Sequence, residues 1–194
     1  NNTRAGKWIV PEIVPGARDL SSQKVGLIGF GAIGQLVAKR LTGFDCEVLY
    51  YRRSGPAEGT GARYAERDEI LETCDIVSLH MPLTEASHHT IGTPELAQMK
   101  SDALLVNTGR GGLVDEAALI DTLTHKRIAG AALDVFTEEP VEPDNPLLRL
   151  ENVLPLPHIG GHSEDNLKRM VGHWASNIRA FHEGRGIDES CIVS

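Results

Sequence analysis

The sequence has few cysteines, no long apolar run and no excess of positive charge, and each shortage narrows what the chain can be. Only three cysteines occur among the 194 residues, Cys46, Cys74 and Cys191, and none forms a C-x-x-C pair. This usage argues against a disulfide framework and against a zinc site, so we expect no metal and a reducing compartment. No apolar stretch reaches bilayer-spanning length, and no charged-then-apolar signal opens the sequence. We therefore expect no membrane partner and a cytoplasmic location.

The charge balance is acidic, with 27 Asp and Glu against 19 Lys and Arg, a formal net charge of −8. Such a balance disfavours nucleic acid and anionic membranes as main partners. The length suits one domain with a short appendage, and a chain of this size can bury a substantial core.

The chain alternates short apolar runs with segments of helical periodicity. The apolar runs predict strands at 24–29, 47–51, 75–79, 103–107, 128–135 and 153–156. The helical spacing predicts helices at 33–41, 66–72, 115–124 and 164–181. Strands separated by helices indicate an α/β fold, a doubly wound parallel sheet of the Rossmann type. In such a sheet ligands bind beyond the carboxyl ends of the strands, so the segments that follow the strands are the candidate sites.

Residues 29–34 read G-F-G-A-I-G, a G-x-G-x-x-G turn between a buried strand and an amphipathic helix. The first glycine permits the turn, the second lets a pyrophosphate approach the backbone, and the third lets the helix pack closely. The helix N-terminus offers free N–H groups and a favourable dipole to phosphate. The predicted dinucleotide contacts in this turn are Gly29, Gly31, Ala32, Ile33 and Gly34.

Two arginines follow the second predicted strand, where dinucleotide-binding folds usually place an acid that holds the ribose. Arg52 occupies that position, with Arg53 and Ser54 directly after it. A carboxylate there repels a 2′-phosphate, whereas guanidinium groups donate hydrogen bonds to phosphate oxygens. A solvated basic loop is the ordinary alternative. The position favours NADP as cofactor, with NAD remaining open.

Charged or titratable side chains also follow the later strands. Arg110 comes after the strand at 103–107, and His158 comes after the last strand. Asp134 lies at the end of the strand at 128–135, and Glu139 follows that strand. Taken singly, each has a structural or surface explanation. Together, at one edge of a sheet, they indicate a shared site.

The motifs that carry these residues resemble those of the coenzyme-binding domain of D-isomer-specific 2-hydroxyacid dehydrogenases. They read N-T-x-R-G-G-L-V-D-E-x-A-L, L-D-V-F-x-x-E-P and P-H-I-G, in that order after the glycine turn. The resemblance implies that His158 is the general acid/base, that Glu139 orients it and favours its protonated form, and that Arg110 binds the carboxylate and keto oxygen of the substrate. It also implies that Asp134 contacts the nicotinamide carboxamide. The remaining cofactor-lining positions are Met81, Pro82, Thr108, Gly109 and Gly160.

The resemblance implies an oxidoreductase that transfers a hydride between NADP(H) and a small 2-keto or 2-hydroxy acid, with glyoxylate or hydroxypyruvate favoured. As hydride reaches the carbonyl carbon, Arg110 stabilises the charge that builds on oxygen and protonated His158 delivers the proton. The alternatives are an NAD-linked, phosphoglycerate-type dehydrogenase and a non-catalytic module that senses a dinucleotide. The family commonly dimerises through this domain, so a homodimer is expected.

Three features depart from the family pattern. Arg52 replaces the acid, and Gly161 and His162 replace the usual small residue and alanine beside the nicotinamide. Family members also carry roughly a hundred residues ahead of this domain, as a second lobe. We therefore expect a connecting segment at 1–22, a dinucleotide-binding domain at 23–183, and a tail at 184–194 that returns to that lobe. Catalysis by the coenzyme domain alone is expected to be weak.

Overall fold

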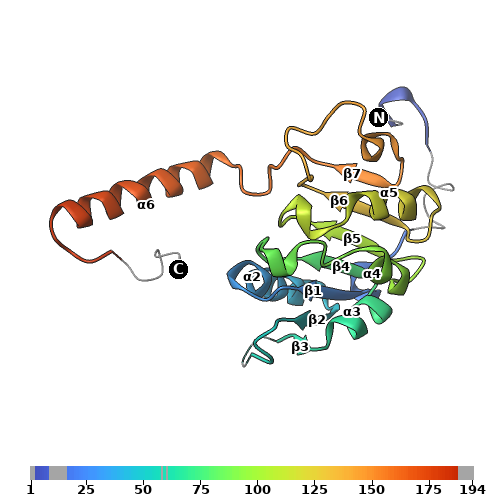
Figure 1. Cartoon of the computed structure of the whole chain (residues 1–194), viewed down its shortest axis with the longest axis horizontal. Coiled ribbons are helices and arrows are strands. Elements are labelled where there is room, and N and C mark those ends of the chain that lie inside the picture. Colours follow the sequence, from blue (N-terminus) through green and yellow to red (C-terminus); the bar gives the residue numbers. More distant parts are fainter. Residues whose placement is uncertain (1–2, 9–16, 58, 60, 188–194) are drawn as a thin grey trace. The chain divides into compact units, whose positions relative to one another are not determined.

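The computed structural model describes residues 3–8, 17–57, 59 and 61–187 (Figure 1). Cys191 and most of the predicted tail lie outside the described residues. Contacts divide the chain into two compact units, Asn1–Leu156 and Pro157–Ser194, which are described separately.

The first unit is built on one sheet of seven parallel strands in the order β3-β2-β1-β4-β5-β6-β7. The strands are β1 (Lys24–Ile28), β2 (Glu47–Tyr51), β3 (Arg63–Tyr64), β4 (Ile76–Leu79), β5 (Leu104–Asn107), β6 (Gly130–Leu133) and β7 (Val153–Pro155). The order reverses direction between β1 and β4, where a doubly wound sheet opens a crevice for ligands. The predicted doubly wound parallel sheet is confirmed.

Helices cover both faces of this sheet (Figure 1). They are α2 (Ala32–Leu41), α3 (Arg67–Thr73), α4 (Thr93–Gln98) and α5 (Glu116–Thr124). Val25 and Leu27 pack in one cluster with Ala38 of α2, whereas Ile28 packs in the other with Ile70 of α3. Alternate residues of β1 therefore meet helices on opposite faces, as expected for a strand that is buried on both sides.

Every strand and helix predicted from the sequence is present, with small shifts in its ends. The largest difference is the strand predicted at 128–135, of which only Gly130–Leu133 pairs in the sheet. Among the strands and α-helices of the described residues, the edge strand β3 and the six-residue helix α4 were not predicted.

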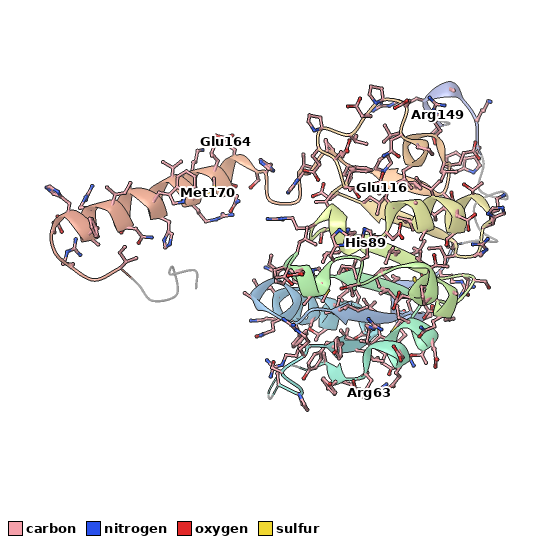
Figure 2. The ribbon with its side chains drawn as sticks, viewed as in Figure 1. Arg63, His89, Glu116, Arg149, Glu164 and Met170 are labelled. Atoms are coloured by element: carbon pink, nitrogen blue, oxygen red, sulfur yellow. The ribbon has the colours of Figure 1, made fainter. Side chains whose placement is uncertain are left out.

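The second unit contains the helix α6 (Glu164–His182), which begins where the Ser163 side chain accepts a hydrogen bond from the Asn166 N–H at 3.0 Å. Figure 2 draws its side chains, with Glu164 and Met170 labelled. Its large apolar residues recur at helical spacing and are exposed: Leu167, Met170, Val171, Trp174, Ile178 and Phe181. None of the helices in the described ranges has the length and apolar character to cross a membrane.

Candidate functional site

The glycine turn after β1 lies against the segment that follows β4. Gly29 has a left-handed φ of 98°, and a Cβ there would lie 2.5 Å from the carbonyl carbon of His80. A Cβ on Gly34 would lie 2.5 Å from the Gly29 carbonyl oxygen. Gly31, which caps α2, differs because a Cβ there would meet no described protein atom within 4 Å. Protein packing therefore accounts for Gly29 and Gly34, while Gly31 faces open space at a helix N-terminus, where a phosphate group fits.

A cavity of about 410 Å³, which we call the Arg52 cavity, extends from this turn to the loop after β2. Three segments line it: the glycine turn, the loop at 52–54 after β2, which we call the arginine loop, and the segment after β4. The lining residues are Gly29, Phe30, Gly31, Gln35, Tyr51, Arg52, Arg53, Ser54, His80, Met81, Pro82, Thr84, Ala86 and Ser87. No described lining residue is acidic, although the whole chain is. The cavity therefore suits an anionic ligand.

A second cavity of about 660 Å³, the Arg110 cavity, adjoins the first. Its lining residues are Gly31, Ala32, Ile33, His80, Met81, Pro82, Leu83, Thr108, Gly109 and Arg110. The two cavities share Gly31, His80, Met81 and Pro82, so they meet at the glycine turn. Ile33 is 66% exposed and offers an apolar wall close to an arginine. One ligand with two anionic or polar ends and a phosphate-rich middle would fit this arrangement.

His80 stands at the junction of the two cavities. Its Nε2 lies 3.0 Å from the hydroxyl oxygen of Ser78, which is itself buried. Burial of the ring lowers the pKa of His80, because the charged imidazolium is less well solvated there. The neutral ring is therefore favoured beside the glycine turn.

Asn107 fixes the turn that carries Arg110. Its side chain is buried at the end of β5, donates from Nδ2 to the Arg110 carbonyl at 3.0 Å, and accepts the Gly109 N–H at 3.1 Å. The Arg110 guanidinium is exposed and donates to the Gly109 carbonyl at 2.7 Å. One buried side-chain amide thus holds both Gly109 and Arg110 of this turn.

The turn that carries Arg110 rests on the loop that carries Glu139. A Cβ on Gly111 would lie 1.9 Å from the Phe136 carbonyl oxygen, so the two backbones are in direct contact. The Glu139 carboxylate accepts the Phe136 N–H at 2.9 Å and is exposed. Asp134 is buried at the end of β6, and its N–H donates to the Asn107 carbonyl at 3.0 Å. Packing thus joins the strand ends that carry Arg110, Asp134 and Glu139.

His158 and Gly160 belong to the second unit. His158 has a left-handed φ of 55°, and its ring lies edge-on to that of His162 at 6.3 Å between centroids. Within this unit it lines a cavity of about 540 Å³ with Ser163, which precedes α6, and with residues of α6 such as Leu167. The convergence of His158 with Arg110 and Glu139 stays a prediction.

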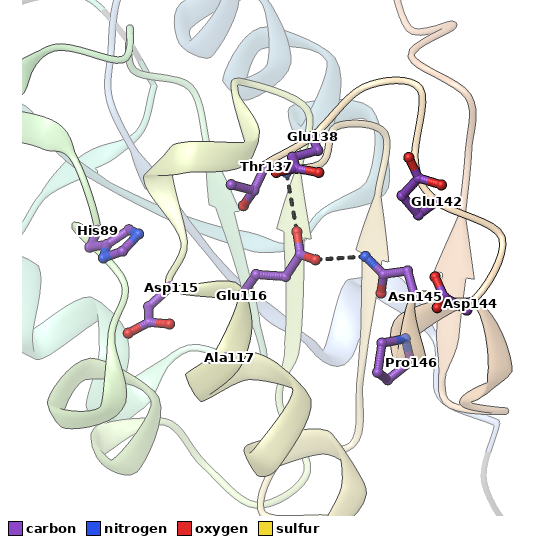
Figure 3. A pocket seen from close by; sticks show the side chains of 10 residues that line it. All are labelled: His89, Asp115, Glu116, Ala117, Thr137, Glu138, Glu142, Asp144, Asn145 and Pro146. Carbon is purple, nitrogen blue, oxygen red and sulfur yellow. Dashed lines mark hydrogen bonds between the residues drawn. The ribbon is translucent and has the colours of Figure 1, made fainter.

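A further cavity of about 600 Å³ lies beside α5 (Figure 3). It is lined by His89, Asp115, Glu116, Ala117, Thr137, Glu138, Glu142, Asp144, Asn145 and Pro146. The Glu116 carboxylate accepts the Thr137 N–H at 3.1 Å and the Asn145 side-chain N–H at 2.7 Å. Because five of the lining residues are acidic, this cavity does not suit phosphate or a carboxylic acid. Its hydrogen bonds instead hold the loop around Glu139.

Most of the predicted contacts lie in one place, and the rest are accounted for differently. The two adjoining cavities contain Gly29, Gly31, Ala32, Ile33, Arg52, Arg53, Ser54, Met81, Pro82, Thr108, Gly109 and Arg110. Gly34 supports the turn, and Asp134 and Glu139 lie in the neighbouring loops. The sequence did not single out Asn107, although a polar residue at the end of a buried strand was a usable signal.

A family model described as D-isomer specific 2-hydroxyacid dehydrogenase, NAD binding domain, matches residues 1–160. The chain is 44% identical over 187 residues to a glyoxylate reductase of Korarchaeum cryptofilum, covering 93% of this chain and 56% of that protein. The chain thus spans little more than half the length of that relative.

Solved structures of dehydrogenases and reductases share the fold of this chain. The chain is similar to D-lactate dehydrogenase with NAD+ from Lactobacillus jensenii, with a TM-score of 0.88 and 30% identity, covering 100% of this chain and 62% of the other. It is also similar to an acyclic imino acid reductase, Bsp5, in complex with NADPH and D-Arg, with a TM-score of 0.87 and 31% identity over 96% of this chain and 59% of the other. The first of these structures contains NAD+ and the second contains NADPH.

Proposed function

Because the chain belongs to the family of D-isomer specific 2-hydroxyacid dehydrogenases, we propose that it is the coenzyme half of an NADPH-dependent reductase of small 2-keto acids. Glyoxylate and hydroxypyruvate are the favoured substrates. The observation that carries the proposal is the pair of adjoining cavities, with arginines at one end, Arg110 at the other, and the glycine turn between them. A domain at 23–183, flanked by connecting segments at 1–22 and 184–194, is part of the proposal.

The first cavity fits the adenosine half of the cofactor. The α2 N-terminus and the open Cα of Gly31 would receive the pyrophosphate, and the arginine loop would receive a 2′-phosphate. The absence of acidic residues among the described lining positions supports the phosphorylated form over NAD. When bound, the nicotinamide would supply the hydride.

The second cavity fits the nicotinamide and the substrate. Arg110 would hold the substrate carboxylate and the carbonyl oxygen, where negative charge builds as hydride adds to carbon. Protonated His158 would give its proton to that oxygen, so that one hydride and one proton convert a keto group to a hydroxyl group. Glu139 would orient His158, and Asp134 and Gly160 would contact the nicotinamide side. In the reverse direction neutral His158 would accept the hydroxyl proton.

Two alternative functions remain, and each agrees with some features of the chain. An NAD-linked, phosphoglycerate-type dehydrogenase agrees with the family but leaves the arginine loop without a ligand. A dinucleotide-sensing module agrees with the glycine turn and the two adjoining cavities, which require only that a dinucleotide binds. Homodimer formation is proposed on the family resemblance, and a cytoplasmic location on the few, scattered cysteines.

Turnover separates these possibilities. The chain is mixed with NADPH and glyoxylate or hydroxypyruvate, and the loss of reduced nicotinamide absorbance is followed beside formation of the 2-hydroxy acid. We expect slow turnover that NADPH supports better than NADH and that Arg110→Ala abolishes. Binding of NADPH with no turnover of either acid would instead favour the sensing module. Turnover only with NAD and phosphoglycerate would favour the NAD-linked, phosphoglycerate-type dehydrogenase.

A further inference from the structure

The two arginines of the loop after β2 occupy different positions in a tight turn. The Gly55 N–H donates to the Arg52 carbonyl at 3.1 Å, which places Arg53 and Ser54 at the two central positions of the turn. Gly55 itself has a left-handed φ of 78°, a conformation that favours glycine. Central residues of a β-turn project their side chains away from the closing hydrogen bond. Arg53 and Ser54 are accordingly exposed, whereas Arg52 is half-buried.

The Arg52 side chain is bound to its own loop. Its Nε donates to the Gly55 carbonyl at 2.6 Å, and Nη2 donates to the Pro56 carbonyl at 2.7 Å. These two nitrogens form one of the edges through which a guanidinium can bind a phosphate in bidentate fashion. A phosphate could use that edge only after both hydrogen bonds were broken.

The far end of the same loop is also fixed. The Tyr50 hydroxyl oxygen accepts the Ala57 N–H at 2.6 Å, and the Tyr50 ring stacks on Phe30 at 3.7 Å between centroids. Phe30 lies within the glycine turn, so the arginine loop is anchored to the wall that would receive the pyrophosphate. The loop is therefore organised before any ligand binds, with Arg52 contributing to that organisation.

The Arg53 side chain differs from that of Arg52 in its hydrogen bonding. Among the described residues, its guanidinium makes no hydrogen bond or ion pair, and it lines the Arg52 cavity beside the Ser54 hydroxyl. All five of its N–H donors therefore remain available to an anion. An exposed guanidinium and a neighbouring hydroxyl are suitable partners for a phosphate monoester.

We propose that Arg53, with Ser54, binds the 2′-phosphate and selects NADPH over NADH, while Arg52 is a positioning residue that holds the loop in shape. This division rests on the proposed function, because it assigns roles within the same cofactor site. It reverses the weight that sequence position alone gives to Arg52.

The test compares dissociation constants for NADPH and NADH in the unmodified chain and in four variants, by titration of nicotinamide fluorescence. Arg53→Ala should weaken NADPH binding about tenfold to a hundredfold and leave NADH binding within about twofold, since only NADPH loses charge-assisted hydrogen bonds. Arg53→Lys should keep part of the preference, because it retains the charge without the planar fork. Arg52→Ala and the milder Arg52→Gln should weaken both cofactors by similar factors and preserve their ratio.

Adenosine 2′,5′-bisphosphate and adenosine 5′-monophosphate serve as probes without a nicotinamide, and thermal melting verifies that each variant is folded. Loss of the NADPH preference in a folded Arg52 variant, or its retention in Arg53→Ala, would overturn the division of roles. Equal affinity of the unmodified chain for both cofactors would overturn the proposed NADPH assignment itself. The two failures are thus distinguishable.

Discussion

The side-chain amide of Asn107 holds the backbone of Arg110, three residues further along the chain, through a hydrogen bond of 3.0 Å to its carbonyl oxygen. The same amide accepts the Gly109 N–H, so one buried side chain closes the turn that presents the guanidinium. An exposed side chain of the candidate site is thereby placed by a buried one. This arrangement makes the geometry of the Arg110 cavity dependent on a residue that does not line it.

Asn107→Ala should lower the free energy of unfolding by about 2 kcal/mol, because it removes two partly buried hydrogen bonds, to the Gly109 N–H and the Arg110 carbonyl. Chemical denaturation measures this change. Gln98→Ala is the matched control, since its exposed amide reaches only the Pro94 carbonyl at 3.3 Å, and it should change stability by no more than about 0.5 kcal/mol. Equal effects of the two substitutions would contradict the role given to Asn107.

Substitutions at two glycines of the turn after β1 should have different effects, one on stability and the other on cofactor binding. Gly34→Ala places a Cβ against the Gly29 carbonyl oxygen and should destabilise the fold by about 2 kcal/mol or more. Gly31→Ala meets no described protein atom and should cost no more than about 1 kcal/mol, the scale of a changed helix cap. It should nevertheless weaken NADPH and NADH alike, because the methyl group occupies the approach of the pyrophosphate. Thermal melts and cofactor titrations of both variants test this, and unimpaired binding by Gly31→Ala would refute it.

Glu116 should stabilise the loop that carries Glu139. Removing its carboxylate in Glu116→Ala breaks the hydrogen bonds to Thr137 and Asn145 shown in Figure 3 and should cost about 1 kcal/mol. Amide hydrogen exchange at Thr137 should quicken as the loop opens. Glu142→Gln, at another acidic position of the same cavity, should leave that exchange rate unchanged. An unaltered rate in Glu116→Ala would show that the loop is held by other contacts.

His80 should make stability depend on pH. Burial favours its neutral ring, so its contribution is fully present above the ordinary pKa of 6.5 and is lost as the pH falls through the lower folded pKa. The free energy of unfolding should therefore decline below about pH 6.5 more steeply in the unmodified chain than in His80→Gln. Denaturation at a series of pH values measures the slopes, with exposed His182→Gln as the comparison. Parallel slopes for the unmodified chain and His80→Gln would argue against a buried neutral ring.

The sequence predicted the elements whose patterns are long enough to read. Residues 24–29 form an apolar run bounded by glycine, and the strand lies there. Strand β3 consists of Arg63 and Tyr64 alone, and two residues cannot show an alternation. Helix α4 was missed although Pro94 near its start and Glu95, which accepts the Gly92 N–H, are typical helix-start signals. Six residues gave too little periodicity.

The candidate site followed from topology, because residues at the ends of parallel strands meet at one edge. On that basis Arg52, Arg53 and Arg110 were predicted to share a site, and in the structure they line two adjoining cavities. It could not show that the Arg52 guanidinium binds the carbonyls of Gly55 and Pro56, since this depends on the backbone of a turn. Nor could it find Glu116, whose partners lie 21 and 29 residues away in the sequence.

The affinity of the unmodified chain for NADPH relative to NADH tests the central claim most directly. Both are measured in one buffer of fixed, moderate salt, because binding of a phosphate by arginine weakens as ions screen it. The Arg52 cavity is lined by two arginines and by no described acidic residue. We therefore predict that NADPH binds at least about tenfold more tightly than NADH, a difference of about 1.4 kcal/mol in binding free energy. Failure of both dinucleotides to bind, or tighter binding of NADH, would contradict the account.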